Sequence, residues 1–191
     1  IVGEGKISQN YPNGPIRGTA WGAHLYAWFC GGTDGYVYTP SSLDELFRNN
    51  GAWPAYIHSA SWGSSTAGEY SSRCVKMDKY VWDNPDFLPV YSAGNDGDYG
   101  TGTIGDPAVA KNVLAVGATQ NWREGYDGGW GNGDPTQIAP FSSRGPCQDG
   151  RIKPDVSSPG VGVLSTRSHG VNYSYGNYNE YYAFDTGTSM A

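Results

Sequence analysis

The chain has 191 residues, 38% of them hydrophobic and 29 of them glycine, and its formal net charge at pH 7 is −6. This length suits one domain with its own core, and the acidic balance, without any Lys/Arg-rich run, argues against nucleic acid and anionic membranes as partners. No apolar stretch approaches the roughly 20 residues that a membrane-spanning helix needs.

Apolar runs alternate with amphipathic stretches along the chain, which is typical of βα units on a largely parallel sheet. Strands are predicted at residues 23–29, 55–61, 87–92, 113–116, 160–166 and 181–184. Helices are predicted at residues 39–50 and 72–83, and the stretch 121–135, rich in Gly, Asp, Asn and Trp, is interpreted as a surface excursion. No internal repeat or domain boundary interrupts this order, so we expect a single α/β domain.

The predicted helix 39–50 carries end signals, and both predicted helices have candidate core positions. In the first, Ser42 and Glu45 have the spacing of a capping box, and Asn50 followed by Gly51 is a stop signal. Apolar residues on one face of the first helix, and apolar positions in the second, are expected to pack against the sheet. These residues are Leu43, Leu46, Phe47, Val75, Tyr80 and Val81.

The sequence Gly-Thr-Ser-Met-Ala at 187–191 is a candidate site for a nucleophile, Ser189. A nucleophilic serine needs a tight turn with small neighbours, so that the substrate backbone can approach, and it gains from lying at a helix start. The pattern alone also fits an ordinary serine at a helix N-cap.

A second candidate site follows the predicted strand 87–92, where Asn95 lies in the sequence Ser-Ala-Gly-Asn-Asp-Gly. A side-chain amide at the carboxyl end of a strand in an α/β sheet faces the crevice where ligands bind, and its N–H can donate to a developing oxyanion. The alternative is a turn residue chosen for left-handed geometry.

Together these two sites resemble the subtilase family of serine proteases, and other blocks agree in order along the whole chain. The blocks that carry the resemblance are residues 18–23 (GTAWGA), 61–64 (SWGS), 105–107 (GDP), 141–145 (FSSRG) and 153–160 (KPDVSSPG). Two departures are Thr19 and Trp21 in the first block. The opening AHLYAW and the stretch FSSRGPCQDGRIKPD look most like the larger bacterial alkaline-protease relatives.

The resemblance implies a subtilisin-like α/β fold, a largely parallel sheet flanked by helices, and serine endopeptidase activity on proteins or peptides. It implies that Ser189 is the nucleophile and that Asn95 contributes to the oxyanion hole. The residues implied to bind substrate are Ser61, Trp62, Gly63, Ser64, Ala93, Gly94 and Gly105. The family also suggests secretion and makes calcium sites possible, although no loop here has a diagnostic set of metal ligands.

The family's catalytic Asp and its HGTHVAG motif with the catalytic His are not found in this sequence. Residues 1–5 (IVGEG) resemble the segment that directly follows HGTHVAG, and Ser189 lies two residues before Ala191. We therefore expect 1–191 to be a partial peptidase catalytic domain, incomplete at both ends and inactive alone, whose partner is the N-terminal remainder of the same domain.

Three histidines and two aspartates are candidates to substitute for the missing residues. His24 and His58 fall inside predicted strands and are expected in the core or on a sheet face, while His169 is expected in a solvated loop. Asp155 resembles a structural aspartate that accepts backbone hydrogen bonds, and Asp185 is expected to cap or orient the turn before Ser189.

Cys30, Cys74 and Cys147 form an odd set without metal-type spacing. They are expected to be small buried apolar residues, or one of them pairs outside this chain.

Two other functions remain open from the sequence. One is an inactive binding module of subtilase fold, and the other is a carbohydrate-binding or structural β-rich protein, which the two predicted helices oppose.

Overall fold

A computed structural model describes residues 1–12, 14–27, 30–32, 34, 36–40, 42–47, 55–122, 133–169 and 176–191. The strand predicted at 23–29 is wrong over its described part, because residues 23–27 form neither strand nor helix and are exposed. Its last two residues lie outside the described residues. An apolar stretch is not sufficient for a strand, which also needs a neighbour with which to exchange backbone hydrogen bonds.

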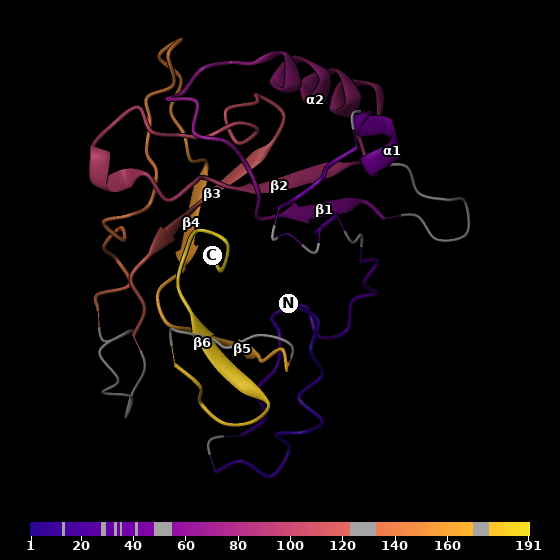
Figure 1. Ribbon diagram of the computed structural model, residues 1–191, viewed down its shortest axis with the longest axis vertical. Coiled ribbons are helices and arrows are strands. Elements are labelled where there is room, and N and C mark those ends of the chain that lie inside the picture. Colours follow the sequence, from indigo (N-terminus) through magenta and orange to yellow (C-terminus); the bar gives the residue numbers. More distant parts are fainter. Residues whose placement is uncertain are drawn as a thin grey trace.

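A four-stranded parallel sheet forms the centre of the fold (Figure 1). Its strands, in spatial order, are β1 (Ile57–Ala60), β2 (Leu88–Ser92), β3 (Leu114–Thr119) and β4 (Val156–Pro159). Each neighbouring pair runs in the same direction. The predicted α/β class is therefore confirmed, and the carboxyl ends of all four strands lie at one edge of the sheet.

Strand β4 was not predicted from the sequence. Its residues Val-Ser-Ser-Pro contain little apolar character, and it obtains its partner only in the fold, where Val156 pairs with Val116 and Pro159 with Thr119. β4 is an edge strand, which is the position that tolerates a proline. Strand β3 also runs three residues beyond its predicted end.

Two helices, α1 (Leu43–Phe47) and α2 (Ser72–Asp83), lie on one side of the sheet (Figure 1). The bounds of α2 are those predicted. Ser71 is its N-cap and accepts hydrogen bonds from the backbone N–H groups of Arg73 and Cys74. α1 is shorter than the predicted 39–50, of which residues 41 and 48–50 lie outside the described residues.

The core between helices and sheet is built from residues of both layers. Leu46 and Phe47 are buried as predicted, and the side chain of Leu43 lies outside the description. On α2 the buried residues are Cys74 and Met77, so the prediction of Val75 was wrong: it is 52% exposed. The predicted Tyr80 and Val81 are half-buried. Cys74 and Met77 are three positions apart and thus share the face that meets the sheet.

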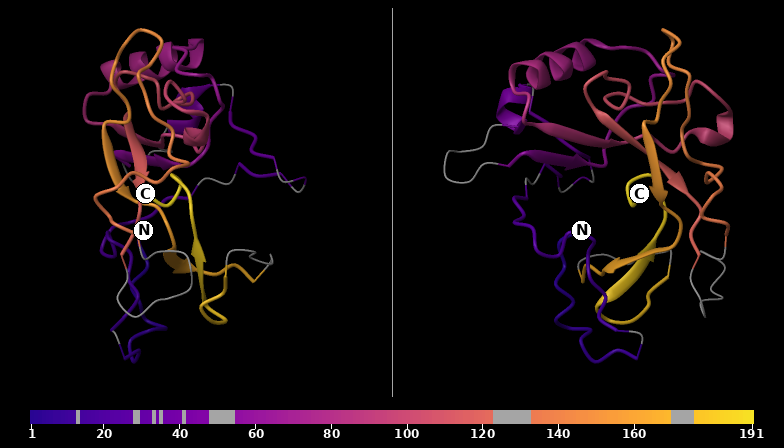
Figure 2. Two further views of the ribbon diagram at one scale, coloured as in Figure 1. Left: turned by 90° about the vertical axis from the view of Figure 1, so that its left-hand side faces the viewer. Right: turned by 180° about the vertical axis from the view of Figure 1, so that it is seen from behind.

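A separate antiparallel hairpin, β5 (Val163–Thr166) and β6 (Tyr182–Asp185), lies below the sheet and next to the N-terminal segment (Figure 2). The fully buried Ser8 accepts a hydrogen bond from the Tyr182 hydroxyl at 3.1 Å, and Asn179 donates to the Tyr11 hydroxyl at 2.7 Å. These contacts join residues 168 and more positions apart. They hold β6, which leads directly into the turn that contains Ser189.

The second face of the parallel sheet carries exposed apolar side chains. Ile57 and Leu88 are partners in the register of β1 and β2, and they are 64% and 41% exposed; Val156 on β4 is 48% exposed. Parallel sheets normally have both faces covered, because their strands are apolar on both sides. This face is therefore an exposed apolar surface in the 191-residue chain.

We predict that residues 1–191 expressed alone associate through this face. The isolated chain should elute as oligomers in size-exclusion chromatography and bind the dye ANS. The double variant Ile57→Glu/Leu88→Glu should reduce both signals, whereas Val75→Glu on the opposite layer should not. A monodisperse wild-type monomer with a cooperative unfolding transition would contradict this expectation.

Candidate active site

The turn that contains Ser189 is tied to the end of β2 by a cluster of hydrogen bonds. Asn95 Oδ1 accepts from both the backbone N–H and the hydroxyl of Thr188, each at 2.9 Å. The backbone N–H of Gly94 donates to Thr188 Oγ1 at 3.3 Å. Folding therefore places the two candidate residues, 94 positions apart in the sequence, on adjoining backbone segments.

The contact with Thr188 also fixes the orientation of the Asn95 amide. A backbone N–H can only donate, so the atom that it meets must be the carbonyl oxygen of the side chain. The amide nitrogen Nδ2 is then the remaining donor, and it makes no hydrogen bond to any residue within the described ranges. It lies 3.6 Å from where a Cβ on Gly187 would be, so it is beside the Ser189 turn.

Asn95 itself is supported by close packing beneath it. Gly94 has a φ of 107°, a value that favours glycine, and a Cβ there would lie 2.9 Å from Ser143 Oγ. Ser143 is buried; its N–H donates to Gly94 O, and its hydroxyl accepts from the Asp96 N–H. The FSSRG block thus braces the turn at 94–96, a role that the sequence did not predict.

The three segments predicted to bind substrate are joined by hydrogen bonds next to this turn; residues 61–64 are mostly exposed, whereas Ala93 and residues 105–107 are buried. Ser64 and Asp106 exchange two backbone hydrogen bonds of 2.9 Å, and the Gly105 N–H donates to Ala93 O at 3.1 Å. The hydroxyl of Ser61 donates to the Ser189 carbonyl at 3.1 Å. Backbone hydrogen bonds, rather than contacts between large side chains, therefore hold these segments together.

Trp62 anchors the first of these segments on the core. Its ring packs edge-to-face with the buried Tyr91 at a centroid distance of 5.2 Å, and the Arg73 guanidinium lies 5.5 Å from the centroid of the Trp62 ring. Tyr91 is fully buried, and burial raises the pKa of its phenol. Gly63, which follows Trp62, leaves backbone atoms exposed toward solvent.

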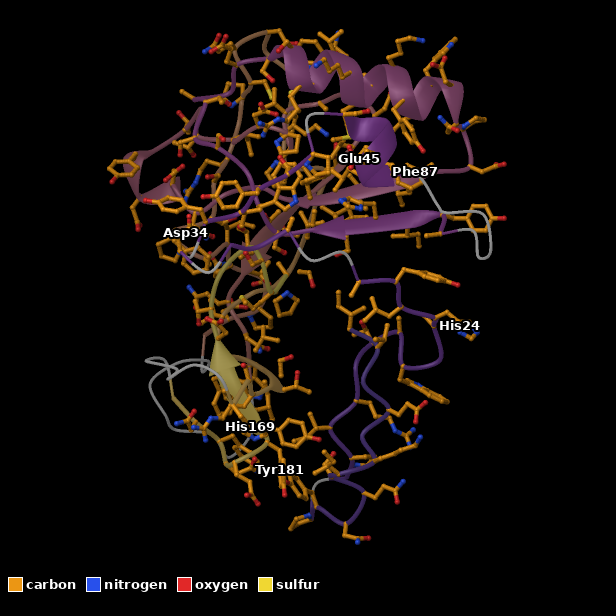
Figure 3. The ribbon with its side chains drawn as sticks, turned by 45° about the vertical axis from the view of Figure 1, so that its right-hand side comes forward. His24, Asp34, Glu45, Phe87, His169 and Tyr181 are labelled. Carbon is orange, nitrogen blue, oxygen red and sulfur yellow. The ribbon has the colours of Figure 1, made fainter. Side chains whose placement is uncertain are left out.

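None of the three histidines makes a hydrogen bond to Ser189 within the described part of the chain. His24 was expected on a strand but is exposed in the N-terminal segment, and His169 is in a loop beside Tyr181, as predicted (Figure 3). The Nε2 atom of His169 lies 3.0 Å from the Glu180 carbonyl oxygen. His58 is half-buried on β1, between Phe47 and Tyr91, at ring distances of 4.8 and 5.7 Å.

The two aspartates have the structural contacts expected of them. Asp155 Oδ2 accepts from the Ala115 N–H at 2.7 Å, which joins β3 to the residue before β4. The same oxygen accepts from the buried Lys153 ammonium at 2.6 Å. Asp185 Oδ1 accepts from the Thr186 N–H at 2.8 Å and so orients the approach to the turn. Both carboxylates are occupied by structural hydrogen bonds.

Cys74 and Cys147 are buried and Cys30 is half-buried, and all three are free thiols. Over the ranges that the structure describes, no group of His, Cys, Asp and Glu side chains is placed to hold a metal ion. No described helix is long and apolar enough to cross a membrane.

Comparison with known proteins places the chain in a family. A sequence model described as the subtilase family, Peptidase_S8, matches residues 4–191. The chain belongs to the subtilase family. The resemblance drawn from Ser189, Asn95 and the accompanying blocks is confirmed at this level.

Two curated relatives of this subtilase are named as proteases. Serine protease AprX of Bacillus subtilis is 40% identical over 77 residues, which is 40% of this chain and 16% of that protein. Minor extracellular protease Vpr of the same organism is 49% identical over 57 residues, or 29% of this chain and 6% of that protein. The chain thus spans less than a fifth of either relative.

Among solved structures, the prenylagaramide maturation protease PagA superposes with a TM-score of 0.52 at 25% identity, covering 82% of this chain and 47% of PagA. The superposition agrees with the subtilisin-like architecture of the described elements, a parallel sheet with helices against one face.

The environment of His58 leads to a prediction about acid stability. Burial lowers the pKa of this imidazole to about 4, and its Nε2 has no hydrogen-bond partner in the described structure. The unfolded state binds the proton near pH 6.5 but the folded state does not, so stability is lost as pH falls from 6.5 toward 4. The loss is at most about 3 kcal/mol.

Replacing His58 by Phe should therefore flatten the stability profile of the full-length protein between pH 7 and pH 4.5, measured by urea denaturation at each pH. His169→Phe removes an exposed histidine and is the matched control, expected to leave the profile unchanged. Identical acid sensitivity in wild type and His58→Phe would show that this imidazole is not the group responsible.

Proposed function

We propose that this chain carries the nucleophile part of a serine endopeptidase domain, with Ser189 as nucleophile and Asn95 as an oxyanion-hole donor. The observation that carries the proposal is the double hydrogen bond from Thr188 to Asn95 Oδ1, which leaves Nδ2 as a donor beside the Ser189 turn. An oxyanion hole requires such a donor, held in place before the reaction starts.

In the proposed reaction, Ser189 Oγ attacks the carbonyl carbon of the scissile peptide bond while its proton passes to a histidine. The carbonyl oxygen becomes an oxyanion, which accepts hydrogen bonds from Asn95 Nδ2 and the Ser189 N–H. Collapse of this intermediate expels the amine, which takes the proton from the histidine, and leaves an acyl-enzyme that water hydrolyses. The histidine and its aspartate are proposed to lie N-terminal to residue 1 in the full-length protein.

Peptide substrates are proposed to bind next to residues 61–64, 93–95 and 105–107, of which Ala93 and 105–107 are buried and support the exposed segment 61–64. Gly63 is exposed and has no side chain, so an extended substrate can approach the backbone at this position. A secreted location is proposed as well; it is supported by the relative Vpr, whose name describes an extracellular protease.

The Asn95→Leu variant of the full-length protein tests the oxyanion role. Because this contact would form chiefly in the transition state, kcat should fall about 100- to 1000-fold, the range known for the corresponding donor in subtilisin, and KM should change little. Melting temperature is measured on the same sample. An unchanged kcat, or a loss that unfolding fully explains, would remove Asn95 from the site.

A fluorophosphonate probe separates the protease from an inactive binding module. In the isolated chain Ser189 lacks a base, so it should react no faster than other serines. Fusion to a subtilase N-terminal segment bearing the Asp and His should produce stoichiometric labelling at Ser189, which Ser189→Ala abolishes. Labelling of the unfused chain would mean that His24, His58 or His169 serves as the base.

A further inference from the structure

The loop between β1 and α2, residues 61–71, is clasped near both ends by a single residue, Asp106. At its start, Ser64 exchanges two backbone hydrogen bonds with Asp106; at its end, the Ser71 hydroxyl donates to the Asp106 carboxylate at 2.7 Å. Between them, the Gly68 N–H donates to the Ile104 carbonyl at 2.9 Å. Residues 104–106 therefore contact the loop at three places. Gln148 adds hydrogen bonds to the carbonyl oxygens of Ala67 and Gly68 at 3.3 and 3.0 Å, and the Ser65 hydroxyl donates to the Asp96 carboxylate.

The backbone part of this clasp leaves no space for adjustment. A Cβ on Gly63 would lie 2.7 Å from the Asp106 carbonyl oxygen, and a Cβ on Gly105 would lie 2.8 Å from that of Ser64. The backbones of residues 63–64 and 105–106 are therefore in direct contact. Movement of one segment must move the other.

The side-chain part is a buried carboxylate at the start of α2. Asp106 is 6% exposed, and its second carboxylate oxygen lies 3.5 Å from Cys74 Sγ. Burial raises the pKa of the Cys74 thiol to about 11, so the thiol is neutral and can donate its proton. Ser71 donates to the carboxylate while it accepts from the first N–H groups of α2, which favour negative charge nearby.

Asp106 is the single acidic residue in the three proposed substrate-binding segments, and a carboxylate there would be expected to attract basic substrate side chains. Its burial and its contacts with Ser71 and Cys74 turn it away from solvent, so this charge is used inside the protein. A buried carboxylate with a hydroxyl donor is costly to disturb, because loss of the donor leaves a charged group unpaired.

We propose that Asp106 is a positioning residue for substrate binding, which fixes the loop 61–71 by joining Ser64 to the N-cap Ser71. Through this loop it sets the surface that a peptide meets next to Ser189, to which Ser61 is hydrogen-bonded. The effect on substrate rests on the proposed protease function. The clasp itself is a property of the folded chain that does not require activity.

The experiment compares four variants of the full-length protein: Ser71→Ala, Asp106→Ala, Asp106→Asn and Ser72→Ala. The first two remove the donor and the acceptor. Asparagine at 106 keeps an oxygen that accepts from Ser71 but has no charge. Ser72 is one residue further along, exposed and without a side-chain hydrogen bond in the described structure, so its variant is the matched control.

The first measurement is amide hydrogen exchange, which requires no activity. Protection of the Ser64 and Gly68 amides should fall at least about tenfold in Ser71→Ala and Asp106→Ala, and should remain in Asp106→Asn and the Ser72 control. Because Ser71→Ala is the milder change, it keeps the test valid if Asp106→Ala does not fold. Unchanged protection in Ser71→Ala overturns the clasp.

The second measurement is peptidase kinetics on protein whose Ser189 reacts with a fluorophosphonate. KM should rise about tenfold in the two disruptive variants, because the segment that binds substrate is no longer held in position, with a much smaller change in kcat. An unchanged KM despite lost protection overturns the positioning role. Equal losses in Asp106→Asn and Asp106→Ala also overturn it, because the charge itself would then act on the substrate. If no variant or wild type is labelled, the proposed function fails while the exchange result still decides the clasp.

Discussion

The parallel pairing of β1, β2 and β3 is the constraint on which the candidate site depends. Because Ile57 pairs with Leu88 and Val90 with Leu114, the strands end at the same edge of the sheet. The chain leaves β1 at residue 61 and β2 at residue 93, so the segments that follow begin as neighbours. A change of register by one residue would send the side chains of a strand to the other face and separate these segments.

Most of the site is then assembled by backbone hydrogen bonds, and side chains are used at few places. Ser64 pairs with Asp106, Gly105 with Ala93, and Ser143 with Gly94. Side chains add to this arrangement: Asn95 is bonded to Thr188 in the Ser189 turn, Ser61 donates to the Ser189 carbonyl, and Asp106 accepts from Ser71. Glycines and small residues occupy the contact positions because the backbones approach too closely for larger ones.

The two faces of the sheet have different roles. One face packs against α1 and α2 around Met77 and Tyr91, both fully buried, and Tyr91 also contacts the Trp62 ring. The other presents Ile57, Leu88 and Val156 to solvent in this chain. The stability of the site in the isolated chain therefore rests on one covered layer, whereas parallel sheets usually have two.

The sequence by itself determined the α/β class, the family, helix α2 and the two candidate residues. Helix α2 was predictable because its helix-forming sequence is a local property of residues 72–83. Ser189 and Asn95 were found because the short motifs around them together resemble the subtilase family. Only the tertiary structure decided which side chains support them. Thr188 is 93 residues from Asn95 and Ser71 is 35 from Asp106, so no local pattern could pair them. The tertiary structure was also needed to find β4 and to exclude a strand at 23–27, since a strand exists only where a neighbour completes its hydrogen bonds.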